Sequence, residues 1–229
     1  MHVSWNIVGA GSIPPGPRPS DEDSTERRRA VREIVPEFEG RCITMGRSPR
    51  RGRYPLGMPV YALGDRTPQI DPTAFVHPDA VIIGDVHVGP ESSIWPTAVL
   101  RGDHGAIRIG AQTSIQDGTI IHCTAELDTV VGDRCVIGHN VHLEGCTVLD
   151  DSLVGSGSVV LHAARIGPHA LVGASALIPG GMIVPRNARA LGVPAKITVD
   201  AVPDNSFAEP VAIYVHNAHW YNADLRRIS

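Results

Sequence analysis

Three histidines and one glutamate in this sequence have the types and spacing to bind a metal ion. His122 stands alone, whereas His139, His142 and Glu144 lie within six consecutive residues. Imidazole and carboxylate groups are the usual ligands of catalytic zinc sites, in which three protein ligands leave a fourth position to water. The opposing interpretation is that each histidine is an ordinary surface residue. The two interpretations differ in whether the fold brings these side chains together.

A repeat of six residues must position these side chains. From Ile70 onwards an aliphatic residue recurs at every sixth position, with interruptions after Leu100, Ile121 and Leu143. A fixed period of six over more than a hundred residues predicts an all-β fold, a parallel β-helix of hexapeptide repeats. The aliphatic positions are Ile70, Val76, Ile82, Val88, Ile94, Leu100, Ile109, Ile115, Ile121, Val131, Ile137, Leu143, Val148, Val154, Val160, Ile166, Val172, Ile178 and Val184.

Each hexapeptide is expected to form one short strand and one turn, and three of them to form a coil of about 18 residues. The aliphatic residue points into the coil, and a small or branched residue four positions later fills the corner. The sequence between Ile70 and Asn187 has room for roughly six such coils. Because loops emerge where a solenoid is interrupted, the three breaks in the repeat predict functional loops.

The repeat brings two of the candidate ligands together. His122 directly follows the inward Ile121, and Glu144 directly follows the inward Leu143, so both side chains point outward. The two are one coil plus a four-residue insertion apart, which predicts that they stack about 4.8 Å apart along the coil axis. His139 belongs to the preceding hexapeptide and emerges at a different edge. It can meet the others only from a neighbouring subunit, which predicts a metal site shared across a symmetric interface.

Composition divides the chain into three zones. Residues 1–57 contain a Pro/Gly stretch, an acidic cluster and arginine runs, and are predicted to be a disordered extension. Alternatives are that translation starts at Met58, or that this tail binds acidic partners. Residues 58–198 are predicted to form the β-helix, and residues 199–229 a helix that packs on it. The helix prediction rests on apolar residues at helical spacing, namely Val211, Tyr214, Val215, Ala218 and Leu225.

Charge, hydropathy and cysteine content favour a cytoplasmic protein with neither a nucleic-acid nor a membrane partner. The net charge is −4, so no overall positive field attracts nucleic acid or anionic lipid. No apolar run approaches the ~20 residues of a membrane span, and the first ten residues lack the features of a secretory signal. The four cysteines form no C-x-x-C pair, as expected of idle thiols in a reducing compartment.

A set of short motifs makes the chain similar to the gamma-class carbonic anhydrase family from Met58 to about Tyr221. This resemblance implies a left-handed β-helix and a homotrimer with zinc, or iron or cobalt, bound between subunits. The implied reaction is the reversible hydration of CO₂ to bicarbonate by a metal-bound hydroxide. The motifs are Leu100-Arg101-Gly102-Asp103, Ile115-Gln116-Asp117-Gly118, the His122 position, Gly138-His139, Gly145-Cys146 and Leu191-Gly192-Val193-Pro194-Ala195-Lys196.

The resemblance also implies a role for each matching residue. His122 and His139 correspond to two metal ligands, and Gln116 to the residue that orients the metal-bound water. The remaining matches are Asp117 as the structural neighbour of Gln116, Arg101 and Asp103 as a pair that holds subunits in register, and, by a looser alignment, Tyr214 and Asn217 on a terminal helix that approaches the site.

The sequence departs from the family at the third ligand. The family's third histidine falls at Glu144, with His142 two residues earlier. Three alternatives follow: Glu144 is the ligand, His142 is the ligand, or the site is two-coordinate and weak. A carboxylate ligand would weaken the metal as a Lewis acid and lower the hydration rate. The acidic proton-shuttle loop of the family is also reduced here, which leaves His104 as the shuttle candidate unless it is a plain exposed loop residue.

Two other functions fit the repeat. A hexapeptide acyltransferase using acetyl-CoA would also place a histidine at the interface, here His122 or His162. Arg101, Asp103 and Gln116 would have no role in such an enzyme. The other alternative is a metal-binding or assembly scaffold without turnover.

Overall fold

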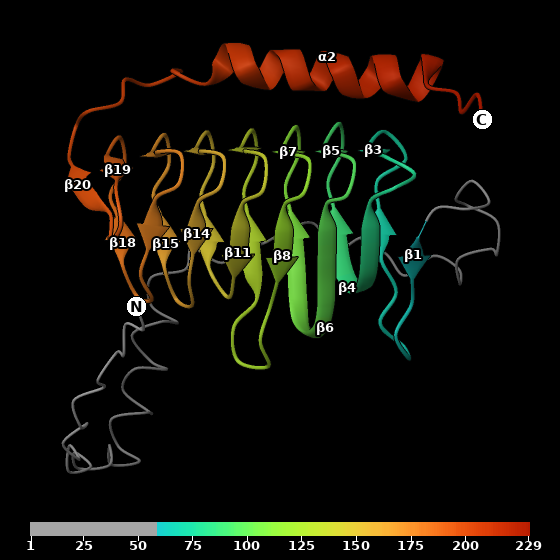
Figure 1. Ribbon diagram of the computed structural model, residues 1–229, viewed down its shortest axis with the longest axis horizontal. Helices are drawn as coiled ribbons and strands as arrows, with labels where there is room; N and C mark the ends of the chain where they lie inside the picture. The colour runs from blue at the N-terminus through green and yellow to red at the C-terminus, as the bar shows by residue number, and fades with distance from the viewer. Residues whose placement is uncertain (1–58) are drawn as a thin grey trace, which may run out of the picture. The chain divides into compact units, whose positions relative to one another are not determined.

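The computed structural model describes residues 59–229, in which the chain forms a left-handed parallel β-solenoid of about seven turns followed by one helix (Figure 1). The sequence predicted this fold class, and the structure confirms it. It has one turn more than the repeat count suggested, and its first short strand precedes the Ile70 repeat. The prediction of a disordered extension over residues 1–57 lies outside the described part of the chain.

The solenoid has three faces, named here the His122 face, the helix face and the third face. The His122 face contains β1 (Val60–Tyr61), β8 (Ile120–His122), β11 (His142–Glu144), β14 (Val159–Val160) and β17 (Leu177–Ile178). The helix face is a sheet of β3 (Phe75–Val76), β5 (Ser93–Ile94), β7 (Ser114–Ile115), β10 (Val136–Ile137), β13 (Leu153–Val154), β16 (Leu171–Val172), β19 (Arg189–Leu191) and the antiparallel β20 (Lys196–Thr198). The third face contains β2 (Gln69–Ile70), β9 (Thr129–Val131), β12 (Thr147–Val148), β15 (Arg165–Ile166) and β18 (Ile183–Val184).

Two long strands, β4 (Val81–Val88) and β6 (Val99–Ile109), pass through the corner between the His122 face and the third face. The first half of β6 pairs with β8 and its second half with β9, so the two faces form one sheet. The prediction of a loop after Leu100 is therefore wrong, because β6 continues through this break as strand. The break after Ile121 does produce a loop, at residues 123–128, whereas the break after Leu143 only shortens the connection from β11 to β12.

The interior consists of the predicted aliphatic positions. Ile82, Ile115 and Ile121 are among many that are completely buried, and small corner residues such as Ala98 and Thr119 are buried beside them.

Successive turns of the solenoid approach each other closely at glycines. A Cβ at Gly110 would lie 2.6 Å from the backbone carbonyl carbon of Gly132 in the next turn, so a side chain there would collide with the neighbouring turn. The absence of a side chain at this position thus allows the two turns to stack closely.

The terminal helix α2 (Ala208–Asp224) lies along the helix face and contacts β3, β5 and β7 (Figure 1). An aromatic cluster attaches it: Trp95 lies 5.3 Å from Phe75 and 5.0 Å from Tyr221 between ring centroids, and Ala218 is fully buried among them. This covering role agrees with the sequence prediction. Within residues 59–229, no helix has the length and apolar character needed to cross a membrane.

Candidate metal centre

The His122 face stacks three of the predicted site residues in one outward column. Arg101 of β6 is in register with His122 of β8, and His122 is in register with Glu144 of β11. The predicted stacking of His122 and Glu144 is confirmed. It follows from the repeat, because each residue comes directly after a fully buried aliphatic residue and must point outward.

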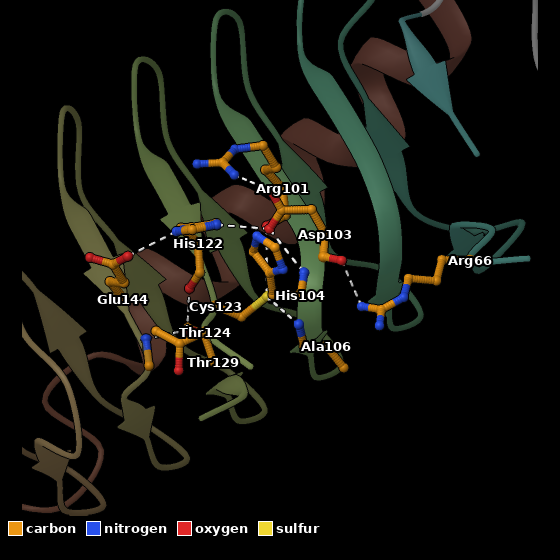
Figure 2. A network of polar contacts seen from close by, with 12 residues as sticks. Arg66, Arg101, Asp103, His104, Ala106, His122, Cys123, Thr124, Thr129 and Glu144 are labelled. Atoms are coloured by element: carbon orange, nitrogen blue, oxygen red, sulfur yellow. Dashed lines mark hydrogen bonds and ion pairs between the residues drawn. The ribbon is translucent and has the colours of Figure 1, made fainter. Parts of the chain in front are cut away.

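His122 lies between two carboxylates (Figure 2). Its Nδ1 is 2.8 Å from Glu144 Oε1, and its Nε2 is 2.8 Å from Asp103 Oδ1. The other oxygen of Asp103 accepts a hydrogen bond from Arg101 Nη1. A neutral imidazole carries only one N–H, so both contacts can be satisfied only by an imidazolium or by a cation that replaces one proton. The two carboxylates therefore hold the imidazole ring from both sides.

Backbone contacts hold this column in place. The buried hydroxyl of Thr129 donates to the His122 carbonyl oxygen and accepts a 2.8 Å hydrogen bond from the Gly145 amide. Thr129 thus ties the end of β8 to the end of β11. Arg66 Nη1 donates to the Asp103 carbonyl oxygen at 2.8 Å. Neither Thr129 nor Arg66 is predicted from the sequence, because neither lies in a motif or at a repeat position with chemical meaning.

The electrostatics of the column keep both carboxylates ionised. Burial opposes the ionisation of Asp103, but hydrogen bonds from His122 and Arg101 outweigh it and lower the pKa of Asp103 to about 2. The hydrogen bond from His122 likewise lowers the pKa of Glu144 against the effect of burial, with further help from the charge of His162. Two anionic oxygens therefore face the same imidazole at neutral pH.

Two further imidazoles approach the second oxygen of Glu144. His142 Nε2 lies 3.5 Å and His162 Nε2 lies 3.4 Å from Glu144 Oε2. Both side chains are well exposed, at 36% and 50% respectively. The sequence suggests His162 only as a histidine for acyl transfer, and its position beside Glu144 is not predicted. Its contact depends on side-chain direction in the turn after β14, which the six-residue period does not specify.

The other predicted site residues lie outside the column, although His104 directly follows Asp103. His139 follows β10 at the edge of the helix face, where its Nδ1 is 3.0 Å from Asp117 Oδ2 and its side chain is 51% exposed. Gln116 is buried directly after β7. His104 is exposed on β6, and its backbone amide donates to Asp103 Oδ1 at 3.0 Å. The ring of Tyr214 packs 6.2 Å from that of Trp95 under α2, and Asn217 is on the same helix.

Arg101 and Asp103 form their ion pair within one chain, although the resemblance implied a pair that acts between subunits. Over residues 59–229 of a single chain, no group of three or more His, Cys, Asp or Glu side chains is already arranged to hold a metal ion. One chain thus brings together Arg101, Asp103, His122 and Glu144, and it leaves His139 at a separate edge.

A second region, between α2 and the helix face, contains a cavity of about 510 Å³. Its solenoid side is formed by Gln112, Arg134 and Asp151, and its helix side includes Phe207 and Val211. Arg134 is bound to Asp151 through two hydrogen bonds of 2.7 and 3.0 Å. None of the predicted site residues lines this cavity, so it is separate from the His122 column.

Comparison with known proteins gives the family. The carnitine operon protein CaiE of Escherichia coli K12 is 42% identical to this chain over 139 residues, which cover 61% of the chain and 71% of the relative. CaiE of Shigella flexneri is also 42% identical, over 148 residues that cover 65% of this chain and 75% of the relative. The chain belongs to the CaiE family. It is a gamma-carbonic-anhydrase-like hexapeptide-repeat protein, as the sequence motifs indicated. No protein-family model matches it.

Solved structures similar to this CaiE-family chain share its solenoid. A putative acetyltransferase of Bacillus cereus superimposes with a TM-score of 0.70 at 33% identity, covering 72% of this chain and 96% of that one. A hexapeptide transferase family protein of Anaplasma phagocytophilum gives a TM-score of 0.66 at 33% identity, with coverage of 71% and 97%.

Proposed function

We propose that this chain forms a homotrimeric metalloprotein of the gamma carbonic anhydrase type, which hydrates CO₂ reversibly at a metal site between subunits. The observation that carries the proposal is the position of His122 between the carboxylates of Asp103 and Glu144, at 2.8 Å from each. The ligands would be His122 and Glu144 of one chain and His139 of a neighbouring chain.

The residues present fit a zinc ion. Ligand distances of 2.0–2.2 Å in a tetrahedral site place two ligand atoms about 3.3–3.6 Å apart. His122 Nδ1 and Glu144 Oε1 are 2.8 Å apart, so a shift of about half an ångström would accommodate the ion. Asp103 on Nε2 would then orient the imidazole, as a carboxylate commonly does for a metal-bound histidine. His142 contacts the other oxygen of Glu144, and this favours Glu144 over His142 as the third ligand.

The outward side of the His122 face supports the trimer. A column of aliphatic residues runs along it in register, next to the column that contains His122. Ile120, at its centre, is 41% exposed. On the helix face α2 covers β3, β5 and β7, whereas within residues 59–229 no helix covers the His122 face. The column contains Val81, Val99, Ile120, Val159 and Leu177, with His142 between Ile120 and Val159.

In the proposed reaction, a bound metal would supply Lewis-acid activation of water for attack on CO₂. Asp103 holds His122 in orientation, and Arg101 balances the charge of Asp103. Gln116 of an adjoining chain would orient the attacking water, and the exposed His104 or buffer would accept its proton. Glu144 adds negative charge where the family has a neutral imidazole, so we expect slower hydration than with three histidines.

The test combines metal analysis with CO₂ hydration kinetics on the purified full-length protein. The proposal expects metal bound by the trimer and hydration that is lost in His122→Ala and in His139→Ala. A metal-loaded trimer without hydration would support the scaffold interpretation. A stable monomer that binds metal as tightly would contradict the shared site.

One observation favours a second candidate, an acyltransferase that uses acetyl-CoA. The exposed imidazole of His162 lies 3.4 Å from the Glu144 carboxylate, and a histidine beside a carboxylate can act as a general base for an attacking hydroxyl or amine. The names of the similar solved structures point the same way. Binding of acetyl-CoA, with transfer to a small amine lost in His162→Ala, would support this candidate over hydration.

A further inference from the structure

Glu144 presents its two oxygens to different partners. Oε1 makes a 2.8 Å contact with His122, which is the length of a hydrogen bond. Oε2 faces His142 Nε2 at 3.5 Å and His162 Nε2 at 3.4 Å. These two separations are too long for N–H···O hydrogen bonds, which span 2.7–3.2 Å. They fall within the 3.3–3.6 Å that separates two ligand atoms on one tetrahedral zinc.

We propose that His142, Glu144 Oε2 and His162 of a single chain form a second metal-binding position, which takes a divalent transition metal such as zinc. Two imidazole nitrogens and one carboxylate oxygen are a ligand set that zinc uses when its fourth position is open. The position requires no residue from a neighbouring chain. It is therefore distinct from the shared site, although both use the carboxylate of Glu144.

The backbone favours this arrangement. His142 and Glu144 flank the buried Leu143 on β11, so both side chains leave the strand on the same outward side. His162 lies in the turn after β14 and rests against Gly145. A Cβ at Gly145 would come 3.1 Å from His162 Cδ2, so the glycine leaves room for the imidazole beside the carboxylate.

The imidazoles can still adjust. The side chains of His142 and His162 are 36% and 50% exposed. Their nitrogens and Glu144 Oε2 are not already arranged around one metal position. Rotation of exposed side chains needs no rearrangement of the solenoid core, where Leu143 and Val160 stay fully buried. Glu144 Oε2 lies between the two imidazole nitrogens, so small rotations of His142 and His162 would bring all three donor atoms to one cation.

The test is a calorimetric titration of the chelator-treated full-length protein with Zn²⁺ alone. We expect two equivalents per chain in the wild type and one in His162→Ala, with the same loss in His142→Ala. His139→Ala should also retain one equivalent, because it removes only the shared site. His87→Ala is the matched control, since His87 is a part-exposed histidine paired with the single carboxylate of Asp85 at 2.9 Å. It should leave both equivalents in place.

The variants separate this inference from the proposed function. If His162→Ala and His142→Ala keep the full zinc content, the second position is refuted. If a single equivalent survives His139→Ala but not His162→Ala, the second position stands and the shared site fails. If the wild type binds a single equivalent of zinc that is lost in His139→Ala and kept in His162→Ala, the shared site stands and the second position fails. A wild type that binds no zinc overturns both.

Discussion

The His122 face and the helix face have the same interior and different exteriors. Inward residues on both are fully buried aliphatics at the repeat positions, such as Ile121 and Ile115. Outward, the helix face is covered within its own chain by α2 through Trp95 and its aromatic neighbours. The His122 face instead presents an aliphatic column and a chain of imidazoles and carboxylates. The repeat therefore determines the fold, and the outward residues determine what each face binds.

The largest expected effect is a loss of folding stability, and it should be similar for a core substitution on either face. Ile121→Ala and Ile115→Ala each remove a completely buried side chain, so each should lower the free energy of unfolding by about 2–5 kcal/mol. Chemical denaturation of the two variants checks this. A loss at only one of them would mean that the two faces do not share one cooperative core.

The covering of the helix face should depend on Trp95. Trp95→Ala removes a nearly buried ring that packs on Phe75 and Tyr221, at a cost of about 3 kcal/mol to the attachment of α2. Hydrogen exchange over residues 208–224 should become faster, and zinc binding should stay unchanged. Loss of zinc in this variant would show that the two faces are not independent.

The aliphatic column of the His122 face, which is partly exposed and has Ile120 at its centre, should mediate assembly. Ile120→Asp places a charge at the centre of the proposed interface, so sedimentation should show dissociation of the trimer. Thr147→Asp, at an outward position of the third face, is the matched control and should leave the assembly intact. Equal dissociation in both variants would argue against an interface specific to the His122 face.

A smaller effect concerns the pH dependence of the helix face. The hydrogen bond from Arg134 lowers the pKa of Asp151 against the effect of burial, so Asp151 stabilises the fold above its unfolded pKa of about 3.9. This contribution, about 1 kcal/mol at most for a partly exposed pair, is lost as the pH falls through the lowered folded value. The stability difference between wild type and Asp151→Asn should be constant from pH 6 to 8 and vanish in acid. A difference that grows in acid would contradict the assignment.

The sequence predicts the interior better than the exterior for a physical reason. Burial of an aliphatic residue at every sixth position fixes which residues point inward, and from this the stacking of Glu144 on His122 follows. The same logic predicted a loop after Leu100, but an interruption of the period can also be absorbed by continued strand, as in β6. The periodicity does not distinguish the two outcomes.

Outward contacts need information that the repeat does not contain. Thr129 and His162 reach the site through side-chain directions and through the connections around β9 and β14, and no six-residue pattern specifies either. The position of His139 at another edge did follow from the repeat, because it belongs to the hexapeptide before His142. Its role at a neighbouring subunit stays a prediction.

The zinc affinity and CO₂ hydration rate of Glu144→His and Glu144→Gln, measured against wild type, test the metal site most directly. Glu144→His restores the family's three-histidine set and should raise hydration at neutral pH. Glu144→Gln keeps the shape of the side chain but removes its charge, so zinc affinity should fall by about ten-fold or more. Unchanged zinc affinity and unchanged hydration in both variants would show that Glu144 is not a ligand and that the His122 column is not the metal site.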